Sequence, residues 1–191
     1  MKDLGELKYF LSIEFSRSQQ GILMHQRKYT LELISELRLG AAKPAITHIK
    51  ANVKLTTKEY DEHIGVLEGT TDETLTDPSK YQRLLGKLLY LTVTRPDIAY
   101  SVKTLSQFLQ KPKRFHMEAA QRVVRYVKGQ PGQGILLSSR KMNTITAYCD
   151  ADWAACPLTR KSVSGFFVKY AESLVSWKSK KQRTISRSSA E

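Results

Sequence analysis

The spacing of the apolar residues changes along this chain, and the change restricts the folds that it can adopt. In the middle of the chain apolar residues recur every three or four positions, which is the spacing of amphipathic helices. Beyond a boundary near residues 130–140 the pattern becomes that of strands, in GILL, TITAYC, SGFFVKY and SLVSWK. The sequence therefore predicts an α+β protein, helical in its middle and rich in strands at its end.

A hairpin and four helices are predicted ahead of this boundary. The runs LKYFLSIEF and ILMH flank a turn of polar residues and glycine, so we expect an antiparallel hairpin. Amphipathic spacing predicts helices over residues 27–39, 79–93, 98–110 and 114–129. The buried side of the second helix is expected to contain Tyr81, Leu84, Leu85, Leu88 and Leu89.

Two stretches have little apolar patterning. Residues 41–77 contain few aromatic residues and much Thr, Lys, Glu and Asp, so we expect an extended linker with little regular structure. The closing residues, SRSSAE, have the composition of a helix start, and we expect a helix to begin there.

The net charge favours a polyanionic partner. The 191 residues include 31 Lys and Arg against 18 Asp and Glu, a formal charge of +13 that is spread along the chain. The most common polyanionic partner of a basic folded protein is nucleic acid, and the next is an anionic membrane surface. A merely basic soluble domain is the alternative.

The two cysteines, Cys149 and Cys156, do not form a recognisable framework. Neither stands at zinc-finger spacing from a histidine or another cysteine, so we expect two reduced thiols. The chain has no apolar run of membrane-spanning length, and its first residues lack the features of a signal peptide. These features predict a cytoplasmic or nuclear protein.

Asp150 and Asp152 end the run TITAYC, inside a basic chain. Residues two apart on a strand point to the same face, so the two carboxylates should lie together. Such a pair is either a solvated strand end or a ligand for a cation, and Mg²⁺ typically takes one or two protein carboxylates, with water and phosphate completing its shell.

Four motifs in order extend this pattern: YCDADWAA, RKSVSGFF, LVSWKSKKQ and RSSAE. Together they resemble the ribonuclease H domain of copia-type retrotransposon polyproteins. YQRLLGKLLYLTVTRPDIAYSV and HMEAAQRVVRYVKGQPGQGILL are similar to the region between polymerase and ribonuclease H in the same elements. In that family a glycine usually occupies the position of Ser12, which implies a positive φ there.

The resemblance implies a division of the chain. Residues 1–40 would be the end of the palm hairpin and the first thumb helix, 41–77 a linker, and 78–139 the helical thumb and connection. Residues 140–191 would begin a ribonuclease H-like domain as an incomplete three-stranded antiparallel sheet with Asp150 on its central strand. We expect a fragment, because the polymerase motif Tyr-x-Asp-Asp and the later ribonuclease H carboxylates are not in the sequence.

The resemblance also implies roles for single residues. Asp150 matches the first metal-ligating aspartate of ribonuclease H, and Asp152 shares its face without being a standard ligand. The intact domain uses two Mg²⁺ ions to hydrolyse the RNA strand of a hybrid. Glu191 matches an acidic position that is not catalytic. We therefore expect weak metal binding at most, and whether this chain is an enzyme stays open.

Two sets of basic residues are candidate contacts to nucleic acid. The helical set either binds phosphates of a template–primer or forms a solvated helix face, and it comprises Arg83, Lys87, Arg122, Arg125 and Lys128. The set near the end of the chain is predicted to hold the backbone of an RNA–DNA hybrid or duplex without regard to sequence, and it comprises Lys178, Lys180, Lys181 and Arg183.

Several other side chains have structural expectations. Tyr9 and Phe10 are expected to pack in the core rather than brace a primer, and Trp153 and Trp177 to be buried or half-buried. His116 is expected to cap or pack, not to ligate. For the present activity of the chain, the sequence allows a catalytically incomplete polyprotein piece, a non-catalytic nucleic-acid-binding remnant, or a decayed or host-adopted reading frame.

Overall fold

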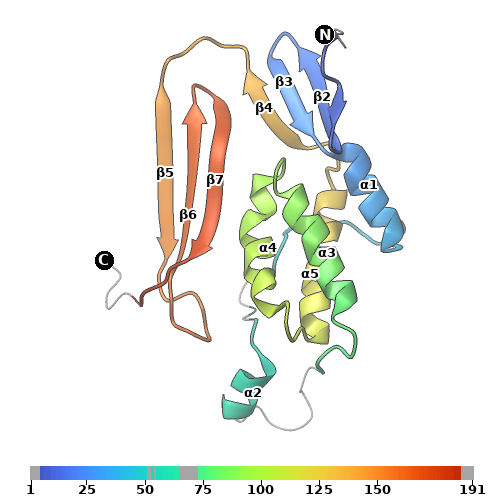
Figure 1. Ribbon diagram of the computed structural model, residues 1–191, viewed down its shortest axis with the longest axis vertical. Helices are drawn as coiled ribbons and strands as arrows, with labels where there is room; N and C mark the ends of the chain where they lie inside the picture. The colour runs from blue at the N-terminus through green and yellow to red at the C-terminus, as the bar shows by residue number, and fades with distance from the viewer. Residues whose placement is uncertain (1–4, 51–52, 54, 65–72, 186–191) are drawn as a thin grey trace.

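Two antiparallel sheets and a layer of helices make up the part of the chain that the computed structural model describes, residues 5–50, 53, 55–64 and 73–185 (Figure 1). The first sheet has the order β1-β2-β3-β4 and consists of Tyr9–Phe10, Ile13–Ser18, Gly21–His25 and Gly134–Ser138. The second has the order β5-β6-β7 and consists of Ile145–Asp152, Val163–Tyr170 and Ser173–Lys181. The predicted α+β class is confirmed.

The helices lie below the four-stranded sheet and beside the three-stranded one (Figure 1). The α-helices are α1 Arg27–Glu36, α2 Lys58–Ile64, α3 Ser79–Leu91, α4 Ala99–Leu105 and α5 Arg114–Lys128. Two 3₁₀ turns flank α4: η1 Pro96–Ile98 and η2 Ser106–Phe108. Within the described ranges, no helix combines the length and apolar character that a membrane crossing requires.

The stretch LKYFLSIEF forms two strands rather than the single predicted one. A tight turn at Leu11 and Ser12 separates β1 from β2, and both residues have positive φ, 46° and 60°. The positive φ expected at Ser12 is confirmed, although serine adopts it less readily than glycine. Tyr9 and Phe10 on β1 are more than half exposed, so the expectation that they pack in the core is wrong.

Strand β4 belongs to the N-terminal sheet, although its sequence groups it with the strands at the end of the chain. It pairs antiparallel with β3 over its whole length. Two glycines permit this pairing: a Cβ on Gly21 or on Gly134 would lie 2.0 Å from the carbonyl oxygen of Leu137 or Met24. Any larger residue at either position would push the strands apart.

The core lies between α1, α3, α4 and α5, and the helix patterns predict most of it. On α3, Tyr81, Leu84, Leu85 and Leu88 are buried as expected. Leu89 is 41% exposed, and Leu91 is buried instead. The stripe advances by three or four residues at each step, so it passes position 91 and leaves position 89 at its edge.

Residues 41–77 are more ordered than a plain linker. Seven of these residues form α2, and Leu55 is buried in the core cluster. Thr74 forms an isolated antiparallel bridge with Lys113 at the start of α5. Apart from α2 and this bridge, the described portion of 41–77 has no helix or strand, so its regular structure is little, as expected. The helix expected at SRSSAE falls in residues 186–191, outside the described residues.

His116 caps and packs, as its sequence position predicts. Its Nδ1 accepts a hydrogen bond from the backbone N–H of Lys113 at 3.0 Å, and its ring stacks on Phe108 with the centroids 3.9 Å apart. Burial first, and then the Lys113 ammonium, lower the pKa of His116 to about 4, against the opposing effects of the Thr56 backbone and the Asp61 carboxylate. The folded protein therefore keeps this imidazole neutral.

This neutral histidine predicts a loss of stability in mild acid. Between pH 6.5 and about 4 the unfolded chain takes up a proton at position 116 that the folded chain does not, so the free energy of unfolding falls as the pH falls. The full effect is about 3 kcal/mol, and most of it precedes the titration of the carboxylates.

Urea unfolding of the wild type and of His116→Gln, measured from pH 7.5 to 5, tests this expectation. The variant should be less stable at pH 7.5 but should lose less stability on acidification. Parallel curves for the two proteins would contradict it. Burial also lowers the pKa of His48, but His48 is present in both proteins and contributes equally to the pH dependence of each.

Candidate functional site

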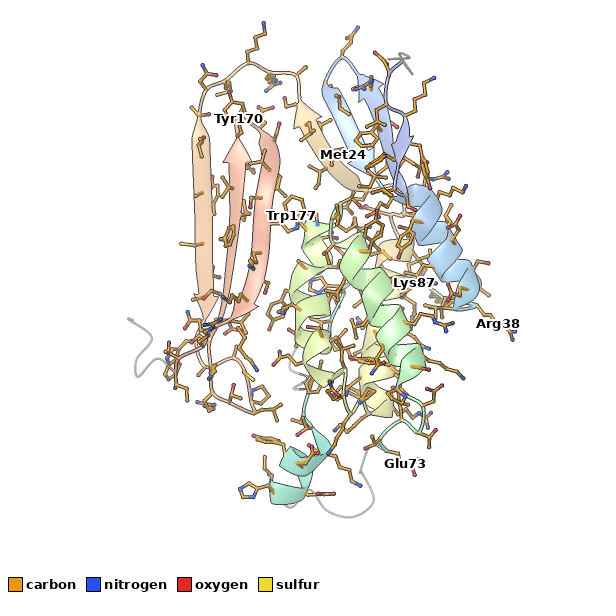
Figure 2. The ribbon with its side chains drawn as sticks, in the orientation of Figure 1. Met24, Arg38, Glu73, Lys87, Tyr170 and Trp177 are labelled. Atoms are coloured by element: carbon orange, nitrogen blue, oxygen red, sulfur yellow. The ribbon has the colours of Figure 1, made fainter. Side chains whose placement is uncertain are left out.

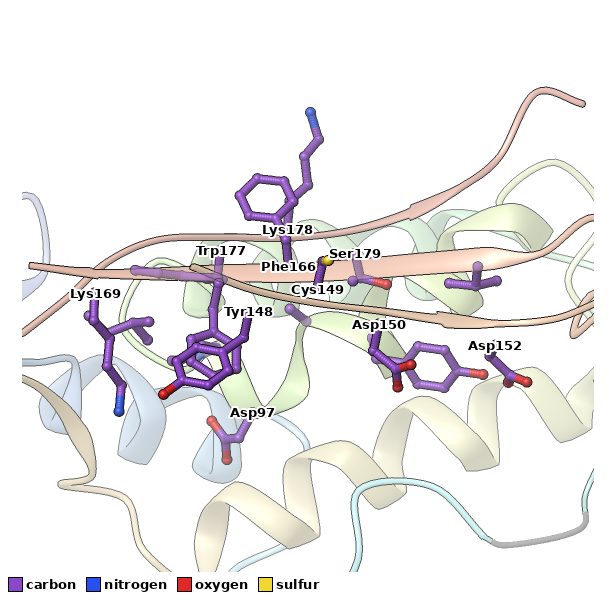
Figure 3. Close-up of a pocket in the computed structure, with 17 residues that line it drawn as sticks. Asp97, Tyr148, Cys149, Asp150, Asp152, Phe166, Lys169, Trp177, Lys178 and Ser179 are labelled. Carbon is purple, nitrogen blue, oxygen red and sulfur yellow. The ribbon is translucent and has the colours of Figure 1, made fainter. Parts of the chain in front are cut away.

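Strand β5 places Asp150 and Asp152 on the face of the sheet that looks toward the helices, together with Tyr148 (Figure 3). Both aspartates are exposed, and neither forms an ion pair with a described residue. Oδ1 of Asp150 accepts a hydrogen bond at 2.8 Å from the N–H of Ala151. Both carboxylates are therefore open to solvent and available to a cation.

Asp150 lies on an edge strand, not on the central strand as expected. In a three-stranded sheet joined by short connections, the strand that is second in sequence is also second in space, and here that strand is β6. Asp150 is paired with Gly165 on β6, so the absence of a side chain opposite leaves space around the carboxylate.

A groove of about 820 Å³ separates this inner face from η1 and α4. Its sheet wall is aromatic: the rings of Tyr148 and Phe167 stack with centroids 4.6 Å apart. Trp177 is half-buried as expected and donates from Nε1 to the carbonyl oxygen of Thr92 at 3.2 Å, which ties β7 to the end of α3 (Figure 2). Trp153 is 46% exposed, so the expectation of burial is wrong for this residue.

The groove offers few metal ligands. Throughout the ranges that the structure describes, no three His, Cys, Asp or Glu side chains come together as a metal-binding group. Asp97 lines the groove as well, but its carboxylate is bound to Arg95 at 2.7 and 2.9 Å. Glu191 lies outside the described residues. The residues present therefore suit an ion held by one or two carboxylates and completed by water or phosphate, and not a two-ion centre.

The basic residues of β7 divide between the two sides of the sheet and its end. Lys178 pairs in register with Phe166, and both project away from the aspartates (Figure 3). Lys180 follows on the same outer face and is exposed. Lys181 instead donates to Oε1 of Gln107 at 2.6 Å, and Arg183 is exposed beyond the strand. The predicted basic set is thus not gathered around Asp150.

Three of the predicted basic residues on α5 bind the chain itself. Arg122 donates to Oγ1 of Thr47 at 2.9 Å, and Nε of Arg125 donates to the carbonyl oxygen of Lys43 at 2.8 Å. Lys128 donates to the carbonyl oxygens of Leu39, Gly40 and Ala42, at 2.5 to 3.0 Å. These groups hold residues 39–47 against the helix, so much of their donor capacity is engaged.

The two predicted residues on α3 differ from each other. Lys87 forms an ion pair with Glu36 of α1, and its side chain points toward that helix (Figure 2). Arg83 is exposed and has no ion pair with a described residue. Of the helical set, Arg83 remains free to contact a phosphate.

Sequence reasoning missed two features of the sheet. Lys169 lies on the same face of the sheet as Asp150, and its ammonium is 5.8 Å from the ring centre of Phe167. It therefore places a basic side chain on the face of the aspartates, which the predicted set of basic residues did not include. On the outer face Phe166 and Tyr170 are 42% and 47% exposed. The alternation of SGFFVKY across two faces was the available signal, but which face is exposed depends on the helices.

The contacts of Lys128 predict a structural role. In Lys128→Met the three carbonyl groups lose their charged donor, and the free energy of unfolding should fall by about 1–2 kcal/mol. Lys103→Met removes an exposed lysine of α4 and serves as the matched control, with a change below about 0.5 kcal/mol.

Urea unfolding of both variants measures the difference, and nucleic-acid affinity supplies a second readout. Both variants should lower that affinity by the same small factor. A larger loss of affinity in Lys128→Met, with unchanged stability, would instead make Lys128 a phosphate contact.

Known proteins resemble this chain over its full length. It is 39% identical over 191 residues to the retrovirus-related Pol polyprotein from transposon RE1 of Arabidopsis thaliana, and 31% identical over 196 residues to that from transposon TNT 1-94 of Nicotiana tabacum. The chain spans only 12% and 14% of these two relatives. An uncharacterized mitochondrial protein of Arabidopsis thaliana is 35% identical over 193 residues, and the match covers 74% of it.

No family model and no solved structure matches the chain. The alignments with the polyprotein relatives cover the whole chain, including the strand that carries the two aspartates and the helices that face it. The chain therefore belongs to the family of retrovirus-related Pol polyproteins from copia-type transposons.

Proposed function

We propose that this chain is the part of a copia-type Pol polyprotein that runs from the end of the reverse transcriptase into the first strands of the ribonuclease H domain. The chain binds nucleic acid through its charge and does not itself hold a complete hydrolytic centre. The intact parent copies RNA into DNA and degrades the RNA strand of the resulting hybrid.

One observation carries the ribonuclease H part of this proposal: the position of Asp150. It lies on the first strand of a three-stranded antiparallel meander, with Gly165 opposite it on β6. Its carboxylate is exposed and forms no ion pair with a described residue. A solvated strand end would also expose a carboxylate. The combination with the ordered motifs DADWA, RKSVSG and VSWKS favours the first aspartate of a nuclease site.

Magnesium is the cofactor that this site fits. When bound, Mg²⁺ polarises a phosphate and lowers the pKa of a bound water. In this chain Asp150 would supply one oxygen ligand to the ion. Asp152, on the same face, would supply a second oxygen ligand either directly or through a bound water. Two carboxylates can position one ion against a phosphate, but they leave a second ion without its share of ligands.

The net charge of +13 supports sequence-independent binding of an RNA–DNA hybrid or a duplex. The available cations are those not engaged within the chain, and they include Arg83, Lys178, Lys180 and Arg183. The number of free cations is smaller than the formal charge suggests, because the basic residues of α5 bind backbone carbonyl groups.

Binding to a hybrid tests the proposal. We expect retention of an RNA–DNA hybrid at 50 mM salt, with an affinity that falls as the salt concentration rises. Four phosphate contacts give a slope of log K against log salt of about −3.6. A flat response, or no binding at low salt, would reduce the positive charge to a solubility feature.

Hydrolysis is the second measurement on the same complex. With Mg²⁺ or Mn²⁺ present, the RNA strand should stay intact, because the described carboxylates are too few to hold two ions. Cleavage that disappears in Asp150→Asn would show that the chain completes a catalytic site. Cleavage that persists in Asp150→Asn would point to a contaminating nuclease.

A further inference from the structure

The outer face of the three-stranded sheet, the side of β5, β6 and β7 that points away from the helices, has a composition unlike that of the inner face. Phe166, Tyr170, Lys178 and Lys180 project from it by strand alternation and register. The two carboxylates of these strands, Asp150 and Asp152, lie on the inner face. Within the three strands, the outer face therefore contains cations and aromatic rings but no acid.

The aromatic rings of the outer face are open to solvent. Phe166 is 42% exposed and Tyr170 47% exposed. The side chain directly across from Phe166 on β5 is the small Cys149, and the next outward residues along β6 are Ser164 on one side and Val168, between the two rings, on the other. Cys149 and Ser164 leave the ring of Phe166 accessible on two sides. Tyr170 lies four positions after Phe166 on β6, a distance of about 13 Å, which is close to the span of two extended nucleotides.

The lysines of the outer face lie at the Phe166 end of the sheet, whereas Tyr170 pairs with Ser173. Lys178 is the register partner of Phe166 on β7, and Lys180 lies two residues further along the same strand. Both are exposed, and neither forms an ion pair with a described residue. A single strand laid along β7 would bring its phosphates to both ammonium groups and a base to Phe166, and its following bases would continue along β6 to Tyr170.

We propose that this outer face binds single-stranded nucleic acid, with bases stacked on Phe166 and Tyr170 and phosphates bound by Lys178 and Lys180. Exposed rings and lysines on one acid-free sheet face are the elements of a stacking platform for single strands. A duplex hides the faces of its bases, so it could use the lysines but not the rings. The inference rests on the proposed nucleic-acid binding and adds to it a separate face and a single-stranded ligand.

Fluorescence anisotropy with a labelled oligothymidylate of about ten nucleotides tests the stacking, with a hybrid duplex of the same length measured alongside. Phe166→Leu and Tyr170→Leu keep the charge and remove a ring. Each should weaken oligothymidylate binding by roughly tenfold and leave hybrid binding nearly unchanged. Phe166→Tyr restores a ring and should bind the oligonucleotide as the wild type does.

Two controls separate this face from the rest of the molecule. Tyr148→Leu removes a ring of similar exposure from the inner face and should leave oligonucleotide affinity unchanged. Lys178→Gln and Lys180→Gln should each reduce the slope of log K against log salt for the oligonucleotide by about 0.7. Thermal unfolding of each variant confirms that the sheet is intact.

The outcomes distinguish the inference from the proposed function. If both ring variants bind the oligonucleotide as the wild type does, or lose hybrid and oligonucleotide affinity equally, the stacking platform is wrong, while charge-driven hybrid binding stands. If neither nucleic acid binds at low salt, both proposals are wrong. Loss of oligonucleotide binding in Tyr148→Leu alone would move the single strand to the inner groove and overturn the outer-face assignment.

Discussion

The buried guanidinium of Arg95 is the interaction on which the arrangement of the helices and the four-stranded sheet depends. Its side chain is 2% exposed and binds the Asp97 carboxylate through two hydrogen bonds, of 2.9 and 2.7 Å. A third donor reaches the carbonyl oxygen of Gln130 at 3.0 Å, and the guanidinium lies 5.7 Å from the ring centre of Tyr126. A buried charge is tolerated only when its partners satisfy it, so these groups must keep their places together.

These partners join three parts of the fold. Asp97 lies in η1, which forms one wall of the groove, Tyr126 lies on α5, and Gln130 directly precedes the turn into β4. Arg95 thereby fixes where the chain leaves the helical layer and enters the first sheet. Burial raises the pKa of Asp97 and its bonds to Arg95 lower it, with a net lowering, so the pair stays ionised and the groove wall keeps its shape.

The charge of the chain has two distinct uses. On α5, Arg125 and Lys128 bind backbone carbonyl groups of residues 39–43 and hold this segment against the helix. On the last sheet, Lys178 and Lys180 lie on the face opposite Asp150 and Asp152, whereas Lys169 shares the face of the aspartates. A metal ion at the aspartates and the phosphates of a single strand at Lys178 and Lys180 would therefore approach this sheet from different sides.

The sequence alone determined the class of the fold, the extents of the main helices and most of their buried positions, because 3.6-residue spacing and capping residues are local signals. It also identified the family and the strand of Asp150 and Asp152. Only the tertiary structure decided that β4 joins β3, that residues 39–47 lie against α5, and that Lys178 and Asp150 point to opposite sides. Pairing between distant strands and the choice of the exposed face depend on contacts far apart in sequence, which no local pattern of residues specifies.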